Sequence, residues 1–391
     1  DTVSGADATE SGTQSVTVTI TENESAPTVT LAVSATSIAE NAGSSLTLTA
    51  TLSGATDETV TVALGTSGSA TEGTDYTDGS GNVDDITISA GSTTGTVNFT
   101  PTDDSVYEND ETATIAITGV SGGGASESGS QSVTITISEN ESAPTVALTV
   151  SASSIAENAG SSLTLTATLS VAADEAVTVS LSTSGTSTEG TDYTDGSGNV
   201  DDITISAGST TGTVNFTPTD DSVYEGNETA IIAISSVSGA DASESGSQSV
   251  TITITENESA PTITLTRSAA SIDENSASTV TLTATISGVT DSAVTVALDT
   301  SGTATEGTDY GTISDITISA GATTGTATLD PTDDNIYEDD ETATIDIGSV
   351  SGKSGVTENG TQQVSVTIAE NESAPTVTLA TSATSIAENA G

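Results

Sequence analysis

One unit recurs along the 391-residue chain at nearly constant spacing. The segment Asn-Glu-Ser-Ala-Pro-Thr begins at Asn23, Asn140, Asn257 and Asn371, so successive copies lie 117, 117 and 114 residues apart. Each full copy carries the same acidic motifs in the same order: Ser-Ile-Ala/Asp-Glu-Asn, Glu-Gly-Thr-Asp-Tyr, Pro-Thr-Asp-Asp followed by Tyr-Glu, and a closing Glu-Asn-Glu. A period this long is one whole domain, not one turn of a solenoid. The repetition therefore predicts an array of domains that share one function.

The motifs set the expected domain boundaries. Residues 1–24 are interpreted as the end of a preceding repeat and residues 373–391 as the start of a following one. Between them lie three full repeats, called here the first (25–141), second (142–258) and third (259–372). Because the chain starts and stops inside a repeat, we expect the natural termini to lie outside it.

Apolar and polar residues alternate with period two in seven segments of the first repeat, which is typical of half-buried strands. These segments lie around residues 29–33, 46–52, 60–64, 86–88, 97–99, 113–117 and 133–137. Glycine, serine and aspartate turns separate them, and no helical period competes. The pattern predicts an all-β fold, a tandem array of immunoglobulin-like antiparallel β-sandwiches with about seven strands each. An acidic chain with few aromatic residues could instead be disordered, particularly without calcium, but the clean alternation favours the sandwich.

The formal charge of −54 arises from 56 acidic residues against only Arg267 and Lys353. Nucleic acid is excluded as a partner because phosphate binding requires cationic side chains, and anionic membrane surfaces are unattractive for the same reason. No apolar run is long enough to predict membrane insertion of this segment. Cysteine and histidine are absent, so disulfides, thiolate chemistry and the usual zinc or copper ligands are excluded. Cations are the expected partners.

The recurring acidic residues fall at predicted strand ends and loops, where clustered carboxylates repel one another unless a cation bridges them. Calcium accepts six to eight oxygen ligands in flexible geometry and is the expected ion, with magnesium second. Solvated turn residues are the simpler interpretation of any single position, and Asp75 could serve only in a turn hydrogen bond. The third repeat lacks four residues of the loop that holds Asp78, Asp84 and Asp85, so these three are expected not to be ligands.

The ordered motifs Ser-Ile-Ala-Glu-Asn-Ala-Gly, Glu-Gly-Thr-Asp-Tyr, Pro-Thr-Asp-Asp-Ser-Val-Tyr-Glu-Asn-Asp-Glu and the closing acidic triplet resemble the Calx-beta domain. The resemblance covers the three full repeats and both partial ones. It implies a calcium-binding sandwich with ions at one end of each domain, with the Val106 carbonyl as an additional ligand. The carboxylate ligands it implies are Glu40, Asp75, Asp103, Asp104, Glu108, Glu111, Glu139 and Glu141 in the first repeat; Glu157, Asp192, Asp220, Asp221, Glu225, Glu228, Glu256 and Glu258 in the second; and Glu274, Asp309, Asp333, Asp334, Glu338, Glu341, Glu370 and Glu372 in the third.

Only two residues separate each closing triplet from a junction proline, so the expected ions lie where one repeat meets the next. We therefore expect a structural, non-enzymatic segment of a long extracellular bacterial surface, adhesin or filament protein, stiffened by calcium. Its expected partners are calcium ions, neighbouring repeats and other copies in a filament or surface layer. A calcium-sensing regulatory module and a surface-layer or sheath subunit remain the alternatives. Near-identical copies without an aromatic sugar platform argue against a glycosidase.

Overall fold

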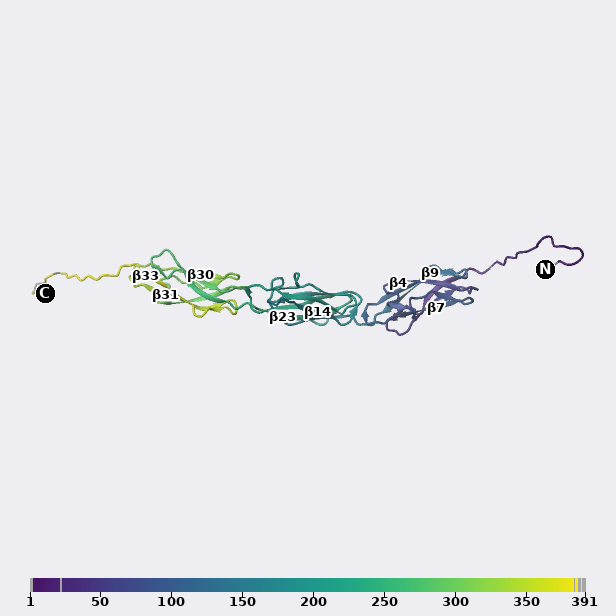
Figure 1. Ribbon diagram of the computed structural model, residues 1–391, viewed down its shortest axis with the longest axis horizontal. Helices are drawn as coiled ribbons and strands as arrows, with labels where there is room; N and C mark the ends of the chain where they lie inside the picture. Colours follow the sequence, from purple (N-terminus) through teal and green to yellow (C-terminus); the bar gives the residue numbers. More distant parts are fainter. Residues whose placement is uncertain (1–2, 22, 383, 386–387, 389–391) are drawn as a thin grey trace. The chain divides into compact units, whose positions relative to one another are not determined.

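The computed structural model describes residues 3–21, 23–382, 384–385 and 388, and throughout these residues the regular structure consists of β-strands (Figure 1). The described part of the chain contains no helix of the length and apolarity needed to cross a membrane. The chain divides into two compact units. One contains Asp1–Pro144 with Val171–Ala176, and the other contains Thr145–Ser170 with Val177–Gly391.

The first repeat is a sandwich of two five-stranded sheets. One sheet has the order β10-β1-β3-β7-β5, formed by Ser126–Glu127, Thr28–Val33, Leu46–Leu52, Thr94–Pro101 and Tyr76–Thr77. The other has the order β2-β11-β9-β4-β6, formed by Ser37–Ala39, Ser132–Ser138, Glu111–Ser121, Val60–Gly68 and Ile86–Ile88. The long strands pair antiparallel, whereas the short edge strands β10 and β2 pair parallel to β1 and β11.

The second repeat has the same topology. Its first sheet, β17-β19-β14-β12-β22, comprises Tyr193–Thr194, Thr211–Pro218, Leu163–Leu169, Thr145–Val150 and Ser243–Glu244. Its second sheet, β13-β23-β21-β16-β18, comprises Ser154–Ala156, Ser249–Thr255, Glu228–Ser238, Val177–Gly185 and Ile203–Ile205.

The third repeat differs only in losing one edge strand, next to its shortened loop. Its sheets are β30-β26-β24-β32, formed by Thr324–Leu329, Val280–Ile286, Thr262–Arg267 and Thr357–Glu358, and β25-β33-β31-β28-β29, formed by Ser271–Asp273, Gln363–Ala369, Glu341–Ser351, Val294–Gly302 and Ile316–Ile318. At the place of the lost strand only an isolated bridge between Tyr310 and Pro331 remains.

Two further pairs of short strands lie outside these sheets. Within the first unit, β8 (Val106–Tyr107) pairs parallel with β15 (Ala172–Ala173). Within the second unit, β20 (Val223–Tyr224) pairs in the same way with β27 (Val289–Thr290). Each pair joins the Pro-Thr-Asp-Asp motif of one repeat to a strand contributed by the repeat that follows in sequence.

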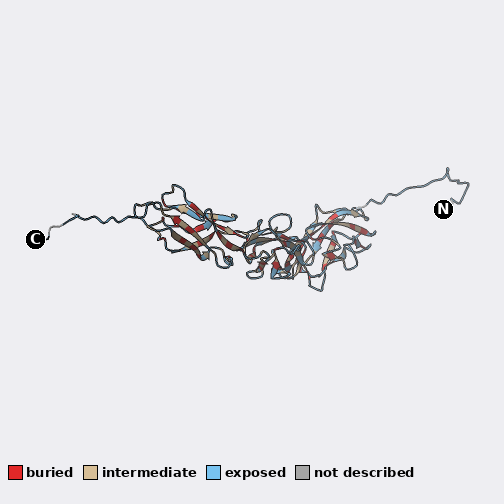
Figure 2. Cartoon of the chain, turned by 60° about the vertical axis from the view of Figure 1, so that its left-hand side comes forward, coloured by how far each residue is buried: buried red, intermediate tan, exposed pale blue. Residues whose placement is uncertain are grey.

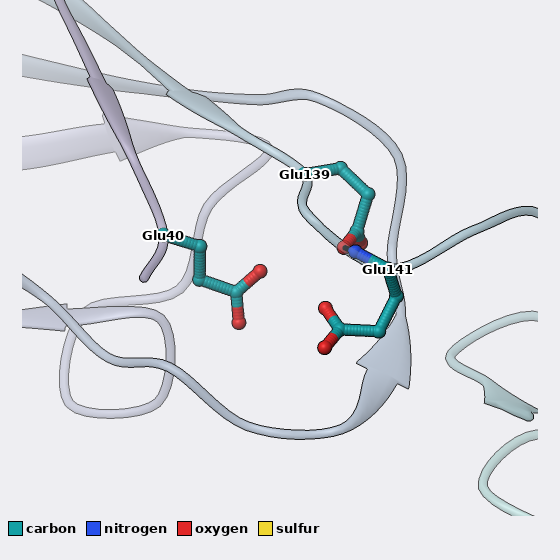
Figure 3. Close-up of side chains that lie close together, drawn as sticks. All are labelled: Glu40, Glu139 and Glu141. Atoms are coloured by element: carbon teal, nitrogen blue, oxygen red, sulfur yellow. Dashed lines mark hydrogen bonds between the residues drawn. The ribbon is translucent and has the colours of Figure 1, made fainter. Parts of the chain in front are cut away.

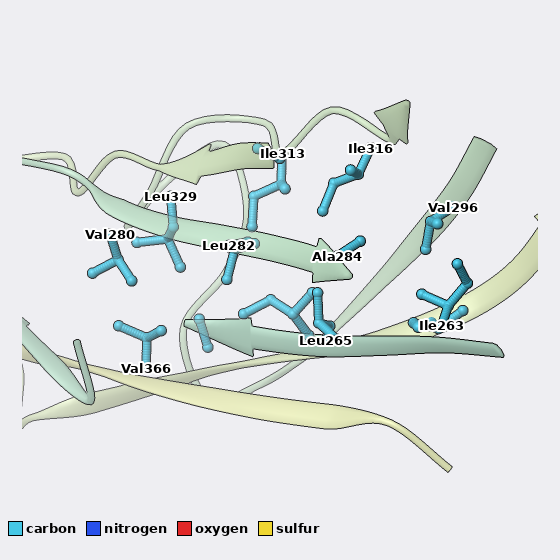
Figure 4. Packing of buried hydrophobic residues seen from close by; sticks show 14 of the residues in the cluster. Ile263, Leu265, Val280, Leu282, Ala284, Val296, Ile313, Ile316, Leu329 and Val366 are labelled. Atoms are coloured by element: carbon cyan, nitrogen blue, oxygen red, sulfur yellow. The ribbon is translucent and has the colours of Figure 1, made fainter. Parts of the chain in front are cut away.

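Alternation along the strands produces the core. Buried positions, red in Figure 2, come from every second residue of the long strands, as in β3, where Leu46, Leu48, Ala50 and Leu52 are all buried. Figure 4 shows the equivalent packing in the third repeat, where side chains of β24 and β26 face the other sheet. The seven predicted strands of the first repeat are all present, and the all-β sandwich fold is confirmed. The four strands that the sequence missed have only two or three residues, too few to show a period.

An aromatic stack anchors the first two cores. The ring of Tyr76 stacks on Phe99 with a centroid separation of 4.5 Å, and Tyr193 stacks on Phe216 at 4.6 Å. All four rings are buried. In the third repeat Leu329 occupies the same register position, opposite Val280, and is equally buried. The site therefore accepts either an aromatic or a branched aliphatic side chain.

Phe99→Ala is expected to lower the free energy of unfolding by about 3–5 kcal/mol, because it leaves a cavity beneath Tyr76. Phe99→Leu should lower the free energy of unfolding by only about 1 kcal/mol, since the third repeat already packs leucine at this position. Urea unfolding of the two variants in the full chain measures both values. Equal losses for alanine and leucine would contradict this account of the core.

Candidate metal centres

The first group of carboxylates in the first repeat, called here the upper triad, consists of Glu40, Glu139 and Glu141 (Figure 3). Glu40 follows β2, and its N–H donates to the carbonyl of Ser138 at the end of β11, 3.0 Å away. The parallel pairing of β2 with β11 therefore places Glu40 beside the closing Glu-Asn-Glu. One carboxylate oxygen from each residue lies within 4.8 Å of the others. The carboxylates of Glu40 and Glu141 face one another in Figure 3.

Backbone donors fix the upper triad. Glu139 accepts N–H hydrogen bonds from Asn140 and Glu141 on Oε1, both at 2.7 Å, and from Glu108 on Oε2 at 2.5 Å. Glu40 Oε1 accepts from the N–H of Asp104 at 3.2 Å. Glu141 Oε2, in contrast, is buried and has no hydrogen-bond partner. A buried acceptor without a donor is costly, so this oxygen is available to a cation.

The second group, called here the lower triad, consists of Asp75, Glu108 and Glu111, again with one oxygen from each within 4.8 Å. Asp75 immediately precedes β5, Glu108 follows β8 and Glu111 begins β9. Asp75 Oδ2 also accepts a hydrogen bond from the N–H of Thr71 at 2.5 Å. The turn role and the triad position that the sequence offered as alternatives for Asp75 are thus both present.

The other repeats reproduce this arrangement. The upper triads are Glu157, Glu256 and Glu258, and Glu274, Glu370 and Glu372; the lower triad of the second repeat is Asp192, Glu225 and Glu228. Glu258 Oε2 and Glu372 Oε2 are buried without a partner, as in the first repeat. In the third repeat one small pocket is lined by Glu274 and Glu370 together with Asp309, Glu338 and Glu341. The upper and lower groups are therefore neighbours in one acidic site.

Burial and mutual repulsion make these carboxyls hard to ionise. Burial, followed by the hydrogen bond and charge of Asp75, raises the pKa of Glu111 to about 8. Burial raises the pKa values of Glu40 and Glu108 to about 7, with neighbouring carboxylates adding to the effect. Glu139 is the exception: burial raises its pKa, but backbone donors from Glu108 and Glu141 outweigh burial and lower the pKa overall. Each site therefore needs protons or a cation at neutral pH.

The paired aspartates of the Pro-Thr-Asp-Asp motif lie at the rim, outside both triads. Asp103 and Asp104 are exposed, and Asp104 Oδ1 accepts from the N–H of Val106 at 2.7 Å. Interaction with the Glu139 side chain, followed by burial, raises the pKa of Glu141, and the charge of Asp103 adds to the effect. Asp220 and Asp221 are likewise exposed, as is Asp333, while Asp334 is half-buried. These aspartates stay predicted ligands, but the structure groups them less tightly than the glutamates.

The loop aspartates that the sequence set aside have other partners. Asp78 Oδ1 accepts hydrogen bonds from the N–H groups of Ser80 and Gly81, at 2.7 and 2.9 Å. Asp85 Oδ1 accepts from the N–H of Leu64 at 3.0 Å, beside the β-bulge in β4. Both are turn and strand-edge interactions, in keeping with their expected role.

Sequence reasoning missed Asp174, which directly follows β15. Its N–H donates to the carbonyl of Tyr107 at 3.1 Å, and its charge contributes to the raised pKa values of Glu108 and Glu111. A signal was available, because Asp57, Asp174 and Asp291 recur at intervals of 117 residues. It was not used because this aspartate faces the acidic site of the preceding repeat rather than its own.

Comparison with known proteins agrees with the fold and the motifs. The model of the Calx-beta domain family matches residues 22–141, 139–258 and 256–372. The chain therefore belongs to the Calx-beta domain family, as three domains in tandem. No curated protein sequence matches the chain.

Among solved structures, the CBD12 fragment of CALX1.2 is 17% identical, with 57% of this chain and 99% of that one covered and a TM-score of 0.26. The apo form of the Calx CBD1 domain is 21% identical over 28% of this chain and 99% of that one, with a TM-score of 0.24. Invasin, titled a bacterial integrin-binding protein, is 16% identical over 87% of this chain and 60% of that one, with a TM-score of 0.30.

In calcium-free buffer, the free energy of unfolding is expected to fall as the pH rises from about 5 to about 8. Glu40, Glu108 and Glu111 have folded pKa values of about 7, 7 and 8 against an ordinary value of 4.5, so the folded chain holds more protons than the unfolded chain in this window. The lowered pKa of Glu139 contributes fully above its ordinary value and changes nothing within the window. Urea unfolding at constant ionic strength tests the trend, and stability that is flat or rising with pH would refute it.

Proposed function

We propose that this chain is a structural repeat segment whose domains are completed by calcium. The observation that carries the proposal is the buried Oε2 atom of Glu141, Glu258 and Glu372, which has no hydrogen-bond partner in any of the three upper triads. A buried carboxylate oxygen is not left uncompensated three times at equivalent positions without large cost. A bound cation supplies the missing partner at each of them.

The chemistry of the donors favours calcium over other ions. Each acidic site offers carboxylate oxygens from two adjacent triads, together with nearby main-chain carbonyls, and the chain contains no histidine or cysteine. Many flexible oxygen ligands suit calcium, whereas magnesium retains much of its water and needs fewer protein ligands. Glu40, Glu139 and Glu141 would hold one ion, and Asp75, Glu108 and Glu111 a second. Bound calcium would screen the repulsion between these groups and stabilise the fold by linkage.

A scaffold role, without catalysis, accounts best for the repetition. The acidic sites are near-identical from repeat to repeat, and the closing Glu-Asn-Glu lies just before each junction proline. Calcium there would stiffen the connection between repeats. A strongly acidic chain without cysteine suits an extracellular bacterial surface, adhesin or filament protein, folding in millimolar external calcium.

Calcium affinity separates the scaffold from a regulatory sensor. Dissociation constants of about 0.1–1 mM are typical of extracellular modules, whereas micromolar values are typical of sensors. Asp75→Asn is expected to weaken binding at the first repeat at least about tenfold, because it removes one charged ligand from the lower triad. Asp84→Asn, which removes the same charge from an exposed loop that is four residues shorter in the third repeat, is the matched control. Isothermal titration of both variants and the wild type provides the measurement. Equal affinities in the three proteins would argue against the lower triad as a calcium site.

Calcium is also expected to extend the chain. Chelation should restore repulsion among carboxylates near each junction and let the repeats bend, so the maximum dimension from small-angle scattering should decrease and protease sensitivity should increase. Scattering at fixed ionic strength with calcium, with magnesium and with chelator separates a specific effect from simple charge screening. An unchanged maximum dimension would contradict the stiffening role.

A further inference from the structure

Lys353 is one of only two cationic side chains in the sequence, and it lies against the acidic site of the second repeat. Its Nζ pairs with Asp291 Oδ1 at 2.7 Å and donates a hydrogen bond to the main-chain carbonyl of Glu225. The side chain is only 13% exposed. It lines one pocket with Glu225 of the lower triad and Glu256 of the upper triad. The ammonium group is therefore held beside the candidate metal site of the preceding repeat.

The loop that carries Lys353 is fitted to this position. Gly352 has a φ of +102°, and a Cβ there would lie 2.2 Å from the carbonyl oxygen of Ala293. Gly355 has a φ of +90°, and a Cβ there would lie 2.3 Å from the Tyr224 hydroxyl. Both positions therefore require glycine, because of backbone conformation and close approach together. The two glycines let the loop reach the Tyr224–Glu225 segment.

The first repeat presents the same frame without the lysine. In both repeats the short strands pair in identical register: Val106 with Ala172 and Tyr107 with Ala173, as Val223 with Val289 and Tyr224 with Thr290. An aspartate follows each contributed strand, Asp174 in one case and Asp291 in the other. The loop equivalent to Ser351–Ser354 reads Ser-Gly-Ala-Asp at residues 238–241, so it carries no cation.

The oxygens held by Lys353 are of the kind that calcium takes as ligands. A main-chain carbonyl and a carboxylate, both beside a triad, are typical hard ligands for this ion. The positive charge of Lys353 also acts on Glu228 of the lower triad. At the first repeat the equivalent aspartate, Asp174, only adds negative charge to Glu108 and Glu111.

The contributed strands cover the segments that they pair with. Tyr107, paired with β15, is buried, and Val223 and Tyr224, paired with β27, are half-buried. The strand from the following repeat, with its aspartate, therefore lies against the acidic site.

We propose that Lys353 is a tethered cation that replaces part of the calcium charge at the acidic site of the second repeat. The first site, which has Asp174 but no lysine at the equivalent loop position, then binds calcium more tightly than the second. The second site keeps its contact with the following repeat in the absence of calcium, because Lys353 already neutralises Asp291. The inference rests on the proposed calcium function. It adds that calcium affinity differs from site to site along the chain.

The test compares Lys353→Met, which keeps the apolar stem and removes the charge, with Arg267→Met, which removes the other positive charge, that of a half-buried arginine whose guanidinium donates to the Ala270 carbonyl. Calorimetric titration of the full chain should show about tenfold tighter calcium binding at the weakest sites of Lys353→Met, or one additional ion by native mass spectrometry, and no change in Arg267→Met. In chelator, Lys353→Met should unfold at lower temperature than Arg267→Met, and calcium should recover more stability in Lys353→Met.

The double variant Lys353→Met/Asp291→Asn completes the cycle, because it removes the ligand that the lysine had occupied. It is expected to lose the gain in calcium binding seen in Lys353→Met. If the wild type binds calcium and Lys353→Met matches Arg267→Met in both titration and melting, this inference is overturned while the proposed function stands. If no variant, including the wild type, binds calcium, the proposed function fails and this inference fails with it.

Discussion

Repulsion among half-buried carboxylates at one end of each sandwich is the constraint on which the rest of this structure depends. Acidic residues lie at the ends of strands, and the fold brings them together, with one carboxylate oxygen from each member of a triad within 4.8 Å of the others. The core itself is made of ordinary valine, leucine and isoleucine side chains and poses no comparable difficulty. Whatever compensates the carboxylates therefore decides how stable each repeat is, and under which ionic conditions.

Hydrogen-bond donors of the chain itself compensate only some of these carboxylates. Backbone N–H groups from Glu108, Asn140 and Glu141 satisfy Glu139, so this carboxylate is held ionised. The opposed Glu40 and Glu141 lack such a set of donors. A fold that arranges donors around one carboxylate and leaves its neighbours short of them supports the proposal of an external cation. The proposed calcium sites follow from this unequal supply of hydrogen bonds rather than from acidity alone.

Each of the first two acidic sites also receives charged residues from the repeat that follows in sequence. Short parallel strand pairs bring Asp174 and Asp291 to the acidic sites of the preceding repeats. At the second site the chain supplies a lysine as well, and at the first it does not. Repeats with near-identical sequences therefore carry different charges beside their acidic sites. The loops differ at two positions, where Lys353 and Ser354 of the third repeat stand in place of Ala240 and Asp241 of the second.

The sequence by itself determined the strands and most of the acidic site. Period-two alternation identified every long strand because burial of one sheet face imposes it, and the recurring motifs singled out Glu40, Asp75, Glu108, Glu111, Glu139 and Glu141. The two-residue strands, the split of each site into two triads and the exposed position of Asp103 and Asp104 were decided only by tertiary structure. So were the roles of Asp174, Asp291 and Lys353, because strand pairing between repeats joins residues that no pattern within one repeat connects.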